Sequence, residues 1–154
     1  MIVLGKFEQL CMVPRRTTAS LSSNPNFCAG VRTEITVPFR SYVLKGDQLQ
    51  SELSPTLLLL HGAGRSGRFK FDGLRCAIHR HGFGSIGLDF IGHGETGGDL
   101  IGSSLASRTD QALAFCEAAG LRDCLAVFGS SMGAYTAVRL TEFLPIDSLI
   151  LNVP

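Results

Sequence analysis

The chain has 154 residues and a formal net charge of +1, and 45% of its residues are hydrophobic against 18% charged. This length suits one domain with a sizeable core, and the apolar fraction excludes a disordered chain. The near-neutral charge and the lack of clustered Lys and Arg exclude a nucleic-acid binder that relies on a basic surface. No apolar stretch is long enough to span a membrane.

Residues 1–33 differ in composition from the rest of the chain. Glu8 is their only acid, and hydroxyl residues crowd the middle of the segment. We expect a leader, mobile and outside the domain. An acid-poor segment with Ser and Arg is also typical of an organellar transit peptide, and that alternative stays open beside a cytoplasmic location.

The regular pattern begins at Glu34. Residues 34–39 and 40–44 favour two short strands, followed by a turn at Gly46-Asp47. Pro38 fits an edge position better than a central one. The run Leu57–Leu60 is apolar at every position, which indicates a strand covered by helices on both faces.

Three more apolar runs, at 85–88, 125–128 and 149–151, alternate with segments of helical length at 71–81, 105–119 and 132–143. This alternation predicts an α/β fold with a mostly parallel sheet and helices on both faces. In such sheets the ligand site lies beyond the carboxyl ends of the strands, so the loops after Leu60, Leu88 and Phe128 are the informative ones.

The sequence Gly129-Ser130-Ser131-Met132-Gly133 follows one predicted strand and opens the next helix. This is the G-x-S-x-G pattern in the strand-turn-helix setting of a nucleophile elbow. The glycines permit a tight turn that exposes the hydroxyl of Ser131. The helix N-terminus behind it offers backbone N–H groups to a forming oxyanion.

Two interpretations compete for the loop after Leu60. In His61-Gly62-Ala63-Gly64, the N–H of Ala63 can pair with that of Met132 to bind an oxyanion. The segment from Gly62 to Gly67 also satisfies G-x-G-x-x-G, and Asp89 ends the next strand, which outlines a dinucleotide site. A histidine before the first glycine and two preceding strands weaken the dinucleotide interpretation.

The loop that begins at Asp89 contains a second histidine, His93, between two glycines. Asp89 and His93 can be read as an acid–base pair, but hydrogen bonds that fix the loop are favoured. His79 and His81 lie near Cys76 without zinc spacing, and the five cysteines include no C-x-x-C pair. We expect no metal, no cofactor and reduced thiols.

The order H-G-x-G, D-x-x-G-H-G, G-x-S-x-G resembles the α/β-hydrolase superfamily, in particular its serine aminopeptidase-like and monoglyceride-lipase-like members. The resemblance covers residues 34–154 and corresponds to the N-terminal part of such a domain. It implies Ser131 as the nucleophile and the backbone of Ala63 and Met132 as the oxyanion hole. The implied supporting residues of the elbow and loops are Gly129, Gly133, His61, Gly62, Asp89 and His93.

The chain departs from this family after Ser131. Family members place an acid and then a histidine after the nucleophile, whereas all four histidines here precede it. We therefore expect an α/β-hydrolase fold truncated before its last strands, with an incomplete triad. Such a fragment should act weakly on a small-molecule acyl substrate (an ester, amide or lipid ester).

Further expectations follow from the same departure. The strand at 149–153 should form an exposed edge prone to self-association. A non-catalytic α/β-hydrolase-like binding module is the alternative function, and a nucleotide-binding Rossmann-like domain is a less favoured one.

Overall fold

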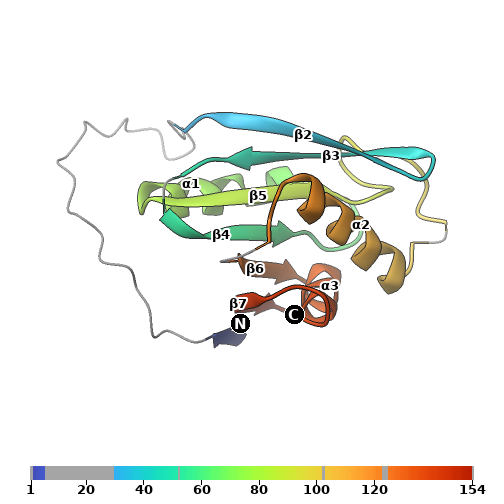
Figure 1. Cartoon of the computed structure of the whole chain (residues 1–154). Coiled ribbons are helices and arrows are strands. Elements are labelled where there is room, and N and C mark those ends of the chain that lie inside the picture. Colours follow the sequence, from blue (N-terminus) through green and yellow to red (C-terminus); the bar gives the residue numbers. More distant parts are fainter. Residues whose placement is uncertain (1, 6–29, 52, 102, 123–124, 154) are drawn as a thin grey trace.

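The computed structural model describes residues 2–5, 30–51, 53–101, 103–122 and 125–153. Seven strands form one sheet in the order β1-β7-β6-β4-β5-β3-β2 (Figure 1). In chain order the elements are β1 (Ile2–Gly5), β2 (Arg32–Phe39), β3 (Tyr42–Leu49), β4 (Leu53–Leu60), η1 (Arg68–Phe71), α1 (Asp72–Arg80), β5 (Phe83–Asp89), α2 (Leu105–Ala118), β6 (Leu125–Ser130), α3 (Met132–Leu140) and β7 (Ile146–Asn152).

The predicted mostly parallel α/β sheet is confirmed. Strand β4 pairs in parallel with β5 and β6, and β6 pairs in parallel with β7. The β2–β3 hairpin joins β5 through β3, which runs antiparallel to both of its neighbours. Strands β2, β4, β5, β6 and β7 therefore run in one direction, and β1 and β3 run in the other.

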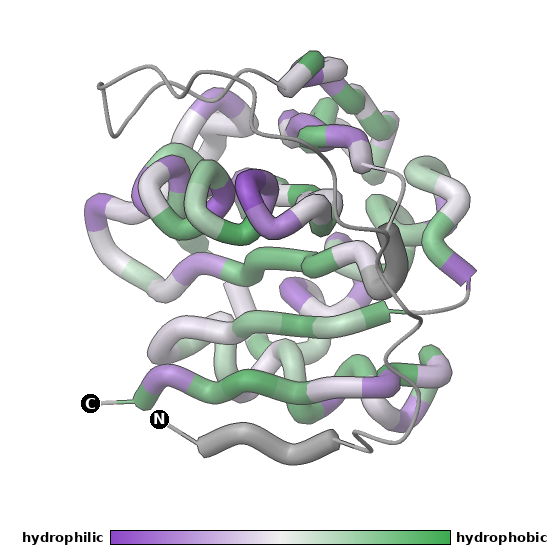
Figure 2. The backbone as a smooth tube through the Cα atoms, turned by 90° about the vertical axis from the view of Figure 1, so that its left-hand side faces the viewer, coloured by the Kyte–Doolittle hydropathy of each residue, from purple (hydrophilic) through white to green (hydrophobic). Residues whose placement is uncertain are grey.

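Both faces of the sheet carry an apolar core, which explains the uninterrupted leucine run of β4. Leu58 and Leu60 pack in the cluster that α2 and α3 cover. Leu57 and Leu59 point to the opposite face and pack with Phe71 of η1, beside α1. Side chains alternate along a strand, so a strand covered on both faces must be apolar at every position. Figure 2 shows these apolar stretches in the central strands.

The three helices agree with the predicted segments within a few residues at each end. Helix α2 begins where the Ser104 side chain accepts a hydrogen bond from the Ser107 N–H at 3.1 Å, an N-cap that satisfies a free donor. Gly120 follows the helix with a φ of 68°, a left-handed conformation that ends a helix at low cost in glycine. No helix among the described residues is long and apolar enough to cross a membrane.

The expected turn at Gly46-Asp47 is wrong, because both residues lie inside β3. The hairpin turns earlier, at Arg40-Ser41, and Pro38 lies on the edge strand β2 as predicted. A side chain at Gly46 would collide with the ring of Phe115 and the backbone of the neighbouring strand. Glycine is therefore required at position 46 by packing against distant residues, and not by the geometry of a local turn.

The expected exposed edge at 149–153 is also wrong. Strand β1 pairs antiparallel with β7, with Ile2 opposite Leu151 and Gly5 opposite Ser148. The leader predicted over residues 1–33 therefore contributes a strand of the sheet at its start, and residues 6–29 lie outside the described residues. This pairing occupies the hydrogen-bonding side of β7 on which the predicted self-association depends.

Candidate active site

Ser131 lies at the sharp turn between β6 and α3. Its backbone has φ 52° and ψ −117°, a conformation that residues other than glycine rarely adopt. The Ser131 N–H donates to the carbonyl of Asn152 at the end of β7, at 2.8 Å, and the side chain is exposed. The fold therefore presents a serine hydroxyl above the carboxyl ends of the parallel strands.

Two glycines make this turn sterically possible. A side chain at Gly129 would come within 2.6 Å of the Ala134 Cα, because the first turn of α3 lies directly against β6. A side chain at Gly133 would come within 2.8 Å of the His61 carbonyl oxygen at the end of β4. Both glycines of the G-x-S-x-G pattern are thus needed for close packing between the helix, its own strand and the neighbouring strand.

The loop after β4 lies beside Ser131. A Cβ placed on Gly62 would lie 3.2 Å from the Ser131 Cβ and 3.7 Å from its Oγ. Gly62 is buried, whereas the next residue, Ala63, is exposed. The structure therefore brings together the two segments that the sequence analysis paired, the His61-Gly62-Ala63 loop and the Ser131-Met132 turn.

The buried ring of His61 holds this loop through contacts of both its nitrogens. Its ring is buried, with Nδ1 2.7 Å from the Gly62 carbonyl oxygen, and Nε2 accepts a hydrogen bond from the Phe90 N–H at 3.1 Å. Burial, with a smaller contribution from the charge of Arg108, lowers the pKa of His61 to about 3. Because Nε2 is an acceptor, the proton of the neutral ring is on Nδ1, where it can be donated to Gly62. The ring therefore ties the β4 loop to the β5 loop.

Asp89 and His93 do not form an acid–base pair. Asp89 accepts hydrogen bonds from the Arg68 N–H at 2.6 Å and the Glu95 N–H at 3.0 Å, and it forms an ion pair with the Arg68 guanidinium. His93 is buried with its Nδ1 3.2 Å from the Ile91 carbonyl oxygen, and its ring lies 4.8 Å from that of His61. Both side chains fix the loop after β5.

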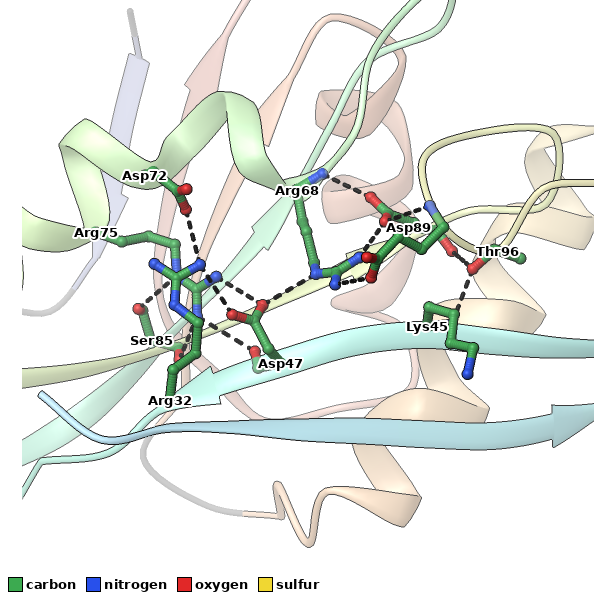
Figure 3. Close-up of polar contacts among 10 residues, drawn as sticks. Arg32, Lys45, Asp47, Arg68, Asp72, Arg75, Ser85, Asp89 and Thr96 are labelled. Carbon is green, nitrogen blue, oxygen red and sulfur yellow. Dashed lines mark hydrogen bonds and ion pairs between the residues drawn. The ribbon is translucent and has the colours of Figure 1, made fainter. Parts of the chain in front are cut away.

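A buried ion-pair network lies on the α1 side of the sheet, and sequence reasoning missed it (Figure 3). Arg75 of α1 donates to Asp47 at 2.7 Å and to Ser85 at 3.0 Å, and Arg68 pairs with both Asp47 and Asp89. In the sequence, each of these charged residues looks like an ordinary solvent-exposed position. Their spacing therefore does not indicate that they are buried and paired. The network joins β3, β5, η1 and α1.

The geometry of the glycine loop does not favour a dinucleotide site. In that motif the last glycine opens a helix whose N-terminus receives the phosphates. Here Gly67 is followed by the single 3-10 turn η1, and Asp89, the candidate ribose ligand, is occupied by Arg68. A cavity of about 330 Å³ is lined by Glu34, Lys45, Arg68 and Glu95 among others, but by no residue of the Ser131 turn. The described residues contain no group of three His, Cys, Asp or Glu that could hold a metal ion.

No family model and no curated protein matches this sequence. Solved structures do match. They include an esterase from Exiguobacterium antarcticum (TM-score 0.66, 16% identity, 79% of this chain and 44% of that chain). They also include the haloalkane dehalogenase DatA from Agrobacterium tumefaciens C58 (TM-score 0.63, 19% identity, 77% of this chain and 39% of that chain). A third is the thioesterase domain from the curacin biosynthetic pathway (TM-score 0.65, 23% identity, 80% of this chain and 47% of that chain). At these identities the likeness shows a shared fold, and this chain spans less than half the length of each of the three.

Proposed function

Because this chain has the α/β-hydrolase fold, we propose that it carries the nucleophile half of a serine hydrolase of the acyl-transfer class. In this proposal the Ser131 hydroxyl attacks the acyl carbon of an ester, amide or lipid ester. The N–H groups of Ala63 and Met132 receive the negative charge that develops on the carbonyl oxygen. The observation that carries the proposal is the strained backbone of Ser131 beside Gly62, at the carboxyl ends of the strands.

We further propose that this chain alone is a weak hydrolase. A serine hydroxyl needs a general base near neutral pH, and all four histidines precede Ser131 in the sequence. His61 and His93 are buried and engaged in the loops, and neither hydrogen-bonds the Ser131 hydroxyl among the described contacts. Serine hydrolases that lose their triad retain about 10³- to 10⁴-fold catalysis over water through binding and the oxyanion hole.

A fluorophosphonate probe and an aryl acetate ester test this proposal. We expect the probe to label Ser131, as located by peptide mapping, and the ester to turn over slowly. Ser131→Ala should abolish both signals, and the same variant should match the wild type in circular dichroism. Turnover at the rate of an intact esterase would refute the weak activity, and turnover unaffected by Ser131→Ala would refute the nucleophile.

A non-catalytic binding module is the second candidate function. The contacts of the two buried histidines favour it, since these contacts lie within the loops and none of them reaches the Ser131 hydroxyl. Absence of probe labelling in a folded wild-type protein would support this alternative over the hydrolase.

A further inference from the structure

Arg108 of α2 is a buried arginine without a carboxylate partner. Its residue is 1% exposed, and the ion pairs of the described residues do not include it. The buried Arg68 and Arg75, in contrast, both pair with Asp47. Burying a cation without a carboxylate partner costs free energy of folding, so the groups that Arg108 contacts must compensate for it.

The contacts of Arg108 converge on the loop beside Ser131. Its Nη2 donates to the His61 carbonyl at 2.8 Å and makes a longer contact of 3.4 Å to the Gly62 carbonyl. The guanidinium lies over the ring of Phe90, 4.0 Å from its centroid, in cation–π geometry. The Nδ1 of His61 lies 2.7 Å from the same Gly62 oxygen. Two buried donors therefore reach the carbonyl of Gly62.

The carbonyl of Gly62 and the N–H of Ala63 belong to one peptide unit. In a planar trans peptide these groups point in opposite directions, so donors that fix the carbonyl oxygen also fix the direction of the N–H. A cation at the carbonyl oxygen polarises the peptide, and polarised hydrogen-bond chains strengthen the donor at their far end. A buried charge has a larger effect there than it would have in water.

We propose that Arg108 is a positioning residue, which holds the Gly62–Ala63 peptide in place and strengthens the Ala63 N–H as a donor to the anionic oxygen formed at Ser131. This inference rests on the proposed function, because only a charged oxygen at Ser131 requires such a donor. Arg108 acts through the peptide and does not touch the substrate.

Nuclear magnetic resonance reports on the peptide independently of the reaction. With ¹³C-carbonyl glycine and ¹⁵N alanine, only the pairs Gly62-Ala63 and Gly133-Ala134 give one-bond-coupled signals. The Ala134 N–H donates to the Ser131 carbonyl at 2.8 Å and serves as an internal control. In Arg108→Met we expect the Ala63 signal to shift or broaden while the Ala134 signal stays in place.

The rate of Ser131 labelling by a fluorophosphonate reports on the chemistry. Loss of one oxyanion donor costs about 10²- to 10³-fold in rate, so a misplaced donor in Arg108→Met should slow labelling about 10- to 100-fold. Arg108→Lys keeps the charge and should recover part of the rate. Arg139→Met removes an exposed arginine of α3 and should label like the wild type. Arg108→Gln is the second neutral variant if Arg108→Met does not fold.

The outcomes separate this inference from the proposed function. An Ala63 signal and a labelling rate unchanged in the folded neutral variants would overturn the role of Arg108 and leave the hydrolase intact. A wild type that does not label, together with an Ala63 signal that moves in Arg108→Met, would refute the hydrolase and support the positioning of the peptide.

Discussion

Mild acid should destabilise this fold through His61. Burial lowers the pKa of His61 to about 3, whereas an exposed histidine in the unfolded chain titrates near 6.5. Between these values the unfolded state binds a proton that the folded state does not bind. The stabilisation is therefore fully present above about pH 6.5 and is lost as the pH falls toward 3.

The magnitude follows from the two pKa values. Each pH unit within this window costs about 1.4 kcal/mol, so acidification from pH 7 to pH 5 should remove about 2 kcal/mol of the free energy of unfolding through His61 alone. The physical cause is a buried ring whose Nε2 must accept from Phe90 and cannot do so once protonated.

Urea denaturation of the wild type and of His61→Gln at pH 7 and pH 5 measures this effect. Other groups titrate over the same range, so the prediction concerns the difference between the two proteins. The wild type should lose about 2 kcal/mol more than His61→Gln on acidification. Equal losses in the two proteins would refute the assignment of a neutral, buried His61.

Three further predictions concern packing, the ion-pair network and a buried thiol. Gly133→Ala should lower the free energy of unfolding by about 3 kcal/mol in urea denaturation, because the new Cβ meets backbone carbonyl groups at the end of β4. Gly73→Ala, in open space on α1, should raise it by up to about 1 kcal/mol, and equal effects of the two substitutions would contradict this reasoning. Arg75→Met should cost up to about 3 kcal/mol, because it removes one buried ion pair of Asp47 while Arg68 and Arg32 remain partners of that carboxylate. Asp47→Asn in that background should recover part of the loss, and an unchanged thermal midpoint in Arg75→Met would disprove the network's role. Burial raises the pKa of Cys116 to about 12, so iodoacetamide at pH 8 should modify this thiol only after unfolding. Rapid modification of Cys116 in the native protein, detected by peptide mass spectrometry, would count against its burial.

Much of the fold was predictable because its signals are local. The all-apolar run Leu57–Leu60 marks a strand covered on both faces, and the structure confirms this. Strand β1 was not predictable, since four residues carry little local signal and their partner β7 lies at the far end of the chain. Gly46 looked like a turn residue because its role, to admit the ring of Phe115, depends on a distant helix.

The candidate site divides in the same way. Ser131 could be located because the turn between strand and helix imposes glycines at fixed spacing around it. Arg108 could not be assigned, although it lies three residues after Leu105 and four before Ala112, on the apolar stripe of α2. A charged residue on such a stripe is the available signal, but it does not reveal that the partners are two carbonyl groups of the loop after β4.

The backbone conformation of Ser131 costs stability and is kept only if the hydroxyl is needed. A residue at φ 52° and ψ −117° occupies a region that glycine enters freely and that costs other residues about 1–3 kcal/mol. Glycine at this position would relieve that strain and remove the hydroxyl. In laboratory evolution of this chain for thermal stability alone, we therefore expect Ser131 to be replaced by glycine early. Sequencing of position 131 in the surviving clones would detect this substitution.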